Sequence, residues 1–313
     1  MLLKSADDKS KRLHLLETLQ NADVLDATQR KWLHEEVVRV TKGLQGERDS
    51  AYYIDSYFKD SANHVVLHDL RLVVDGDVAQ IDHLIFNRGL GAYLIETKNY
   101  AGNLDINERG EFTASYGRMQ FGVPSPLEQS KRHERVLLKC LHQLGISGRM
   151  QSDLRMIHLV MLHPKAIIHR PPAAAFDTSN VIKADQFPQW HRQFIDGVGV
   201  ATVLKAAVNM RSLDTLADWG RKLMQLHQPA DPLALPAFMQ PKHPVHGWAV
   251  APTPDAAGAE QASAADTTPP TKRLLCAECG SKISYAEGKY CWNQPQRFGG
   301  LQYCREHQRQ FTG

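Results

Sequence analysis

Apolar residues follow helix-like and strand-like spacing over most of the first 226 residues. Helical spacing covers residues 10–42 and 46–58, where apolar side chains recur every three or four positions. Three runs rich in β-branched and other apolar residues follow at 64–74, 78–87 and 91–98. The pattern therefore predicts a helical start followed by three consecutive strands.

A second group of elements is expected after residue 100. Ser125 and Pro126 form a clear helix start, because proline at the first helical position gives up no donor that the helix needs. An order of helix, three strands, helix and strand is typical of a mixed sheet flanked by helices, so we expect an α/β fold. The expected elements are strands at 102–107 and 110–115, a helix at 126–144, a strand at 155–163, and a strand near Val181 with terminal helices in 164–226.

The composition of residues 228–271 differs from that of the rest of the chain. This segment holds nine of the sixteen prolines, together with many alanines, threonines and serines. Such a segment buries little apolar area, so we expect a flexible linker. The expected organisation is a helical arm at 1–42, an α/β domain with a helical C-terminal extension at 43–226, a linker at 227–271 and a small module at 272–313.

The composition favours a globular protein that acts outside the membrane. Of the 313 residues, 42% are hydrophobic and 23% are charged, which is ordinary for a globular protein. No apolar run reaches the roughly 20 residues that span a bilayer. The first residues lack the apolar core of a secretory signal, which favours the cytoplasm. The net charge of +3 is too small to indicate a nucleic-acid partner by itself.

Asp82, Glu96 and Lys98 lie on two adjacent strand patterns. Glu96 and Lys98 are two positions apart, so they project from the same face of a strand. A three-residue loop at 89–91 would set Asp82 opposite Lys98, on that face, whereas a two-residue loop would point it away. The glycines at both ends of this loop favour the longer form, because one position must usually be left-handed.

Two carboxylates at strand ends suit a divalent cation. Mg²⁺ prefers oxygen ligands, and Asp82, Glu96 and the carbonyl of Thr97 would hold one. The metal would lower the pKa of its bound water, and Lys98 would orient that water or stabilise the developing negative charge. A solvated strand end with a salt bridge is the simpler interpretation of the same residues.

Two further polar residues fit such a centre. Glu47 follows Gly43-x-x-Gly46 at the expected start of a helix, where a carboxylate is favourable to the helix dipole and within reach of a metal. Gln129 lies in the first turn of the helix at 126–144. It shares a helical stripe with His133, and we expect this stripe to face the sheet.

These motifs together resemble the NERD (nuclease-related) domain over roughly residues 40–165. The resemblance implies a restriction-endonuclease-like fold with a PD-(D/E)xK core. It also implies that Glu47, Asp82 and Glu96 act around a divalent metal, Mg²⁺ or Mn²⁺, with Lys98 in catalysis and Gln129 as a supporting polar residue. The matching motifs are Gly43-x-x-Gly46-Glu47, Gln80-x-Asp82, Ile95-Glu96-x-Lys98-Asn99-Tyr100-x-Gly102 and Pro126-x-x-Gln129, with Ile81 in place of the motif's proline.

A cysteine cluster at the C-terminus indicates a second metal site. Four of the five cysteines lie in the last 38 residues, and clustered cysteines in a reducing compartment are more often metal ligands than disulfides. Cys276-x-x-Cys279 and Cys304-x-x-His307 are spaced as two ligand pairs of a structural Zn²⁺ in a zinc ribbon, with Cys291 as the alternative to His307. The aromatic residues of this module suit either a nucleic-acid surface or a small core.

These features favour a cytoplasmic, metal-dependent nuclease that acts on DNA in processing, repair or defence. One alternative is a non-catalytic adaptor that binds DNA or a protein partner through the zinc ribbon. Hydrolysis of RNA is a further alternative.

Overall fold

The computed structural model describes residues 1–239 except 23, 90, 101 and 148–153, and in the C-terminal region residues 276–279, 281–284, 287, 290, 291, 294, 298 and 301–309. The chain divides into two compact units, Met1–His246 and Gly247–Gly313. No helix in the described part of the chain is long and apolar enough to cross a membrane.

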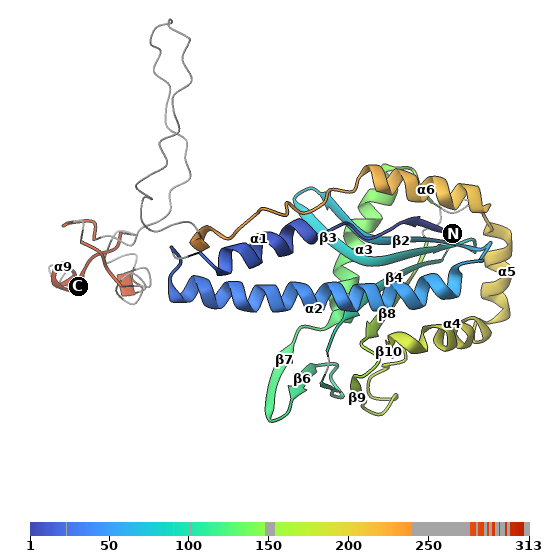
Figure 1. The fold of residues 1–313 in the computed structure, drawn as a ribbon, viewed down its shortest axis with the longest axis horizontal. Helices are drawn as coiled ribbons and strands as arrows, with labels where there is room; N and C mark the ends of the chain where they lie inside the picture. Colours follow the sequence, from blue (N-terminus) through green and yellow to red (C-terminus); the bar gives the residue numbers. More distant parts are fainter. Residues whose placement is uncertain are drawn as a thin grey trace, which may run out of the picture. The chain divides into compact units, whose positions relative to one another are not determined.

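A six-stranded mixed sheet forms the centre of the first unit (Figure 1). Its strand order is β1-β2-β3-β4-β8-β10, in which β2, β3 and β4 are antiparallel neighbours and the other pairs are parallel. A smaller sheet has the order β7-β6-β5-β9. The strands are β1 (Leu2–Lys4), β2 (His64–Val74), β3 (Asp77–Asn87), β4 (Gly91–Lys98), β5 (Asn103–Ile106), β6 (Phe112–Tyr116), β7 (Met119–Val123), β8 (Arg155–Leu162), β9 (Ile167–His169) and β10 (Val181–Lys183).

Helices lie on both faces of the large sheet, which confirms the expected α/β class. One face is covered by α3 (Pro126–Gln143) and α6 (Leu213–Gln225), and the other by α2 (Ala27–Phe58) and α4 (Phe187–Asp196). The remaining described helices are α1 (Ser10–Gln20), α5 (Val200–Asn209) and α9 (Arg305–Gln308), with 3-10 turns at Ala184–Gln186 and Ala237–Met239.

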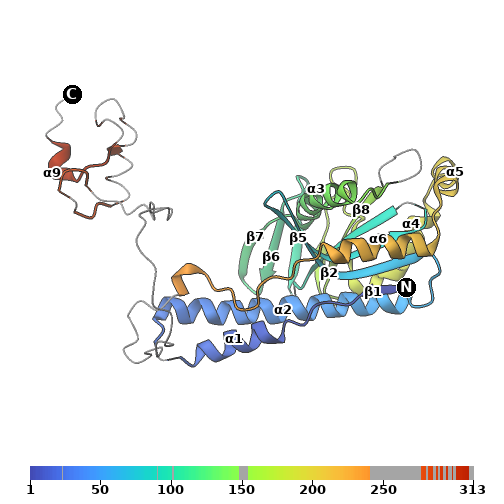
Figure 2. The same cartoon turned by 90° about the horizontal axis from the view of Figure 1, so that it is seen from above.

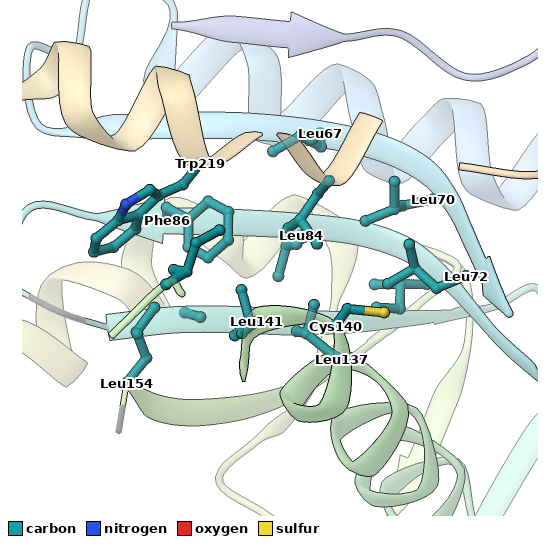
Figure 3. Packing of buried hydrophobic residues seen from close by; sticks show 14 of the residues in the cluster. Leu67, Leu70, Leu72, Leu84, Phe86, Leu137, Cys140, Leu141, Leu154 and Trp219 are labelled. Atoms are coloured by element: carbon teal, nitrogen blue, oxygen red, sulfur yellow. The ribbon is translucent and has the colours of Figure 1, made fainter. Parts of the chain in front are cut away.

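The core between the sheet and the α3–α6 layer fixes these helices in place (Figure 3). Leu137 and Leu141 of α3 are buried in the same cluster as Phe86 of β3. Trp219 of α6 meets Phe86 edge-on, with the ring centroids 6.2 Å apart. Each fully buried side chain of this size contributes roughly 1.5–3 kcal/mol, so the position of α3 against the sheet is strongly specified.

Helix α2 is one continuous helix of 32 residues, and the expected helix ends near residues 42 and 46 are wrong (Figure 2). It begins with a capping box, in which the Gln29 N–H donates to the Asp26 side chain and the Asp26 N–H to Gln29 Oε1. Gly43 and Gly46 do not end the helix, because an interior glycine costs only about 1 kcal/mol. Glu47 therefore lies in the middle of α2, and the helix-dipole role expected for a first-turn carboxylate does not apply.

The second of these glycines lies at a close contact between α2 and the end of β4. A Cβ atom on Gly46 would lie 2.8 Å from Asn99 Cβ and 3.4 Å from Thr97 Cγ2. The Asn99 amide also donates to the Lys42 carbonyl at 2.7 Å. This contact brings Glu47, the next residue of the helix, towards the end of the strand.

Residues 227–239, expected as the start of a flexible linker, pack on the helical arm instead. Met239 is buried in one cluster with Leu16, Leu25 and Leu33, and the carbonyl before it, that of Phe238, accepts a hydrogen bond from Gln29 at 2.7 Å. Apolar residues within this proline-rich segment therefore complete the core of the arm. The rest of the expected linker, residues 240–271, lies outside the described residues.

The C-terminal unit has a small core of its own. Phe298 and Tyr303 belong to this core, whereas Tyr290 is 46% exposed. Tyr285 and Trp292 lie outside the described residues. The described core residues are Cys276, Ile283, Cys291, Phe298 and Tyr303.

Replacing Gly46 by alanine is expected to lower the free energy of unfolding by about 1–3 kcal/mol, because the added methyl group overpacks the contact with Asn99. Gly43→Ala is the matched control on the same helix, since a Cβ atom there meets nothing within 4 Å. It is expected to raise the free energy of unfolding by up to about 1 kcal/mol. Urea unfolding followed by circular dichroism measures both, and equal effects would contradict the contact.

Candidate active site

Asp82 and Glu96 lie opposite each other where β3 and β4 part. The residue pairs between these strands run from Asn87–Gly91, next to the loop, to His83–Ile95 at the other end. The loop therefore spans residues 88–90, and continuing the same register by one residue beyond His83–Ile95 sets Asp82 opposite Glu96. The expected pairing of Asp82 with Lys98 is therefore wrong by two residues. The expected loop length of three is right, and the turn begins one residue early because the Asn87 side chain accepts the Gly89 N–H at 2.7 Å.

A side chain replaces the backbone partner at this point of the sheet. The Asp82 carboxylate accepts the Thr97 N–H at 2.7 Å. The Thr97 hydroxyl lies 3.1 Å from His83 Nε2, and His83 Nδ1 lies 2.7 Å from His68 Nδ1. These bonds fix Asp82 and Thr97 where the strands separate.

Lys98 connects β4 with the first turn of α3. Its ammonium donates to Glu96 Oε1 at 2.6 Å and to Gln129 Oε1 at 3.1 Å. Glu96 is only 3% exposed. His133 Nδ1 lies 3.6 Å from Glu96 Oε2, so the stripe of α3 that carries Gln129 and His133 faces the sheet as expected. Burial lowers the pKa of His133 to about 4, and the imidazole is neutral at pH 7.

Glu47 approaches from α2 and is paired with a residue that sequence patterns did not indicate. Lys9 Nζ lies 3.1 Å from Glu47 Oε2 and 3.2 Å from Asp69 Oδ2. Lys9 is 38 positions from Glu47, and no local pattern marks it as a site residue. Asp69 did leave a signal, since it is an acidic residue within a strand made mostly of apolar residues, where it is 3% exposed.

Asp69 occupies the same step of the β2–β3 ladder as Asp82. The pairs on either side of this step are His68–His83 and Leu70–Ile81. Asp69 has a φ of 54°, which is uncommon for a residue other than glycine. The irregular backbone of β2 at Asp69 therefore lies next to the point at which β3 separates from β4.

Burial and mutual repulsion raise the pKa values of the three carboxylates expected to bind a metal. The pKa of Asp82 is raised well above its usual value, mainly by burial and then by the charges of Glu96 and Glu47. Burial also raises the pKa of Glu96 and of Glu47, although Lys98 and Lys9 respectively oppose the change. Buried and half-buried carboxylates that repel one another form an arrangement that a divalent cation neutralises.

These three carboxylates are near one another without sharing a preformed ligand cage. Within the described part of the chain, the only set of three or more His, Cys, Asp or Glu residues placed to share one ion lies in the C-terminal unit. Lys98, Glu96 and Gln129 are joined by direct hydrogen bonds. Asp82 joins them through Thr97, whereas Glu47 interacts with them through charge and is bonded to Lys9.

The C-terminal set consists of Cys276, Cys279, Cys304 and His307, whose ligand atoms lie within 4.8 Å of one another. Cys291 is not part of it, since its buried sulfur accepts the Tyr303 N–H at 3.4 Å. Although burial acts to raise it, the backbone N–H groups of Cys279 and Cys304 lower the pKa of the Cys276 thiol to about 6, which favours a thiolate at neutral pH. Three thiols and one imidazole in this arrangement are compatible with a zinc ribbon.

Comparison with known proteins identifies the family of the domain that carries the candidate site. Residues 42–168 match the family model of NERD, the nuclease-related domain. The matched segment contains Glu47, Asp82, Glu96, Lys98 and Gln129, and it leaves Lys9 outside. No curated protein and no solved structure matches the chain. Residues 42–168 of this chain therefore form a nuclease-related (NERD) domain.

Proposed function

We propose that the protein hydrolyses phosphodiester bonds of nucleic acid, with DNA as the preferred substrate, at a divalent metal held by Asp82, Glu96 and Glu47. The observation that carries the proposal is the Lys98 ammonium. It is bonded to both Glu96 and Gln129 and lies beside carboxylates whose pKa values are raised. The nuclease-related domain supports the same class of reaction.

The donor set suits Mg²⁺ or Mn²⁺. These cations take oxygen ligands, and α2, β3 and β4 each place one carboxylate near this strand end. The bound metal would supply an activated water and neutralise charge on the attacked phosphate. The repulsion that raises the pKa values of Asp82 and Glu96 would be relieved at the same time.

Lys98 would act as a fixed cation and not as a base. Burial acts to lower its pKa, but the charges of Glu96 and Asp82 outweigh this effect and the pKa is raised. The ammonium is therefore protonated at neutral pH, which suits it to donate to the attacking water or to a phosphate oxygen. Gln129 holds its second hydrogen bond, so the orientation of the ammonium is set before substrate binds.

The C-terminal unit would bind a structural Zn²⁺ through Cys276, Cys279, Cys304 and His307. Four protein ligands leave no open position for catalysis, and thiolate ligands suit a reducing compartment such as the cytoplasm. The unit would hold nucleic acid, or a protein partner, through its exposed surface. Its covalent link to the nuclease-related domain would raise the local concentration of that domain on the bound nucleic acid.

Full-length protein with Mg²⁺ or Mn²⁺ is expected to cleave DNA, and Asp82→Asn and Glu96→Gln are each expected to slow cleavage by roughly 10³-fold, since several kcal/mol of charge stabilisation would be lost. Glu128→Gln is the matched control, because this carboxylate is exposed on α3 next to Gln129. Gel assays with labelled DNA and RNA measure the rates and the substrate preference.

Full cleavage by both site variants would show that this centre is wrong. Binding of DNA in EDTA without any metal-dependent cleavage would instead indicate the non-catalytic adaptor. The bond between Glu47 and Lys9 is the observation that favours this second function, because it withholds one carboxylate from the proposed metal.

The substitution Asp82→Asn is also expected to stabilise the metal-free protein at neutral pH. Because the folded-state pKa of Asp82 is raised, its contribution to stability is complete below the ordinary pKa and is lost as the pH rises through the raised value. Asparagine keeps an oxygen that accepts the Thr97 N–H. The gain in the free energy of unfolding should grow as the pH rises above about 4, the ordinary pKa of aspartate, towards the raised value. Urea unfolding without added divalent cation measures it, and a gain independent of pH would contradict the prediction.

Cys304→Ser is expected to abolish stoichiometric zinc binding, whereas Cys291→Ser is expected to keep it. The first substitution removes a thiolate from the ligand set, and the second changes a sulfur that lies outside this set. Zinc content per chain, measured by atomic emission after gel filtration, checks both. Loss of zinc in Cys291→Ser with retention in His307→Ala would reverse the assignment of the fourth ligand.

A further inference from the structure

Lys9 contacts the carboxylates of the nuclease-related domain from outside the segment that defines it. Its ammonium lies between Glu47 Oε2, at 3.1 Å, and Asp69 Oδ2, at 3.2 Å. The side chain of Asp69 is 4% exposed, and those of Glu47 and Lys9 are 23% and 30% exposed. The Lys9 ammonium therefore lies on the more solvent-exposed side of the Glu47 and Asp69 carboxylates.

The turn that carries Lys9 is held in place by other bonds. Lys4 Nζ donates to the carbonyls of His68 and Asp69 at 3.1 and 2.9 Å. The Asp7 N–H donates to Asp69 Oδ2 at 3.1 Å. Helix α1 begins directly after Lys9, at Ser10. These bonds fix the backbone next to Lys9 beside Asp69, so the position of Lys9 is set by the fold and not by the flexibility of its side chain alone.

Asp69 is held more firmly than Glu47. In addition to Lys9, it accepts hydrogen bonds from the Asp7 N–H and the Gln80 amide. The described hydrogen bond of the Glu47 carboxylate is the one that it accepts from Lys9. When the bond between Lys9 and Glu47 breaks, Asp69 is placed to keep the ammonium.

We infer that Lys9 is a positioning residue of the site, whose ammonium is the counter-ion of Glu47 in the metal-free protein and is displaced from Glu47 when a divalent cation binds. This inference rests on the proposed function, because it takes Glu47 as a metal ligand. Lys9 lowers the metal affinity, since the metal must compete with it. The bond between Lys9 and Glu47 also explains why Glu47, Asp82 and Glu96 do not share a preformed ligand cage.

Mn²⁺ binding to the full-length, zinc-loaded protein tests this role independently of cleavage. Free Mn²⁺ is followed by electron paramagnetic resonance, and Glu96→Gln identifies the binding that belongs to the site. Lys9→Met, which keeps most of the stem, is expected to bind Mn²⁺ about five-fold more tightly, equivalent to about 1 kcal/mol. Lys9→Gln removes the charge but keeps a donor for Asp69, and it is expected to show the same gain even if Lys9→Met folds poorly.

Two further variants serve as controls. Lys9→Arg keeps the cation and is expected to retain the wild-type affinity. Lys11→Met removes an exposed ammonium from helix α1, two residues after Lys9, and is also expected to change nothing.

The outcomes separate this inference from the proposed function. If wild-type protein shows no Mn²⁺ binding that Glu96→Gln removes, both are wrong. If that binding exists but Lys9→Met and Lys9→Gln leave its affinity unchanged, or weaken it, only the role of Lys9 is overturned. An equal gain in Lys11→Met would also overturn it, because the effect would then arise from net charge alone.

Discussion

Helix α2 and the end of β4 approach each other so closely at Gly46 that no side chain fits between them. Thr97 lies on the strand side of this contact. Its N–H donates a hydrogen bond to Asp82, and its hydroxyl is hydrogen-bonded to His83. Glu47 follows Gly46 on the helix and is carried towards the same strand end. One contact therefore couples a helix to two strands, and the relative positions of Glu47, Asp82 and Glu96 depend on it.

The charges of the site are distributed unevenly among its partners. Each of two carboxylates has an ammonium of its own, with Lys98 bonded to Glu96 and Lys9 to Glu47. Asp82 has the Thr97 N–H as its described hydrogen-bond donor, and its pKa is raised well above the usual value. Asp82 is thus the carboxylate whose charge is least compensated, and a cation placed beside it would gain most.

Sequence patterns predicted the strands of the site well because their side chains are locally constrained. Asp82 and Glu96 lie in strands made mostly of buried apolar residues, and the cap at Ser125 fixes the start of the helix that carries Gln129. The course of α2 was not predictable in the same way, since glycine usually marks a helix end and the reason for Gly46 is a distant contact with Asn99. The role of Lys9 at the site could not be predicted for the same reason, because its partners Glu47 and Asp69 are distant in the sequence and it lies in a polar stretch.

The segment that matches the family model, residues 42–168, is shorter than the folded unit that contains it. The match begins at residue 42, inside α2, and ends at residue 168, before β10, α4 and α6. Without α6, Trp219 would be missing and the face of the sheet that carries Phe86 would be open to water. Without the first half of α2, the clustered leucines of the arm would lose their partner Leu33. The smallest autonomous form of this nuclease-related domain is therefore close to the whole of residues 1–239. The elements outside the matched segment are therefore structural parts of the same folded unit.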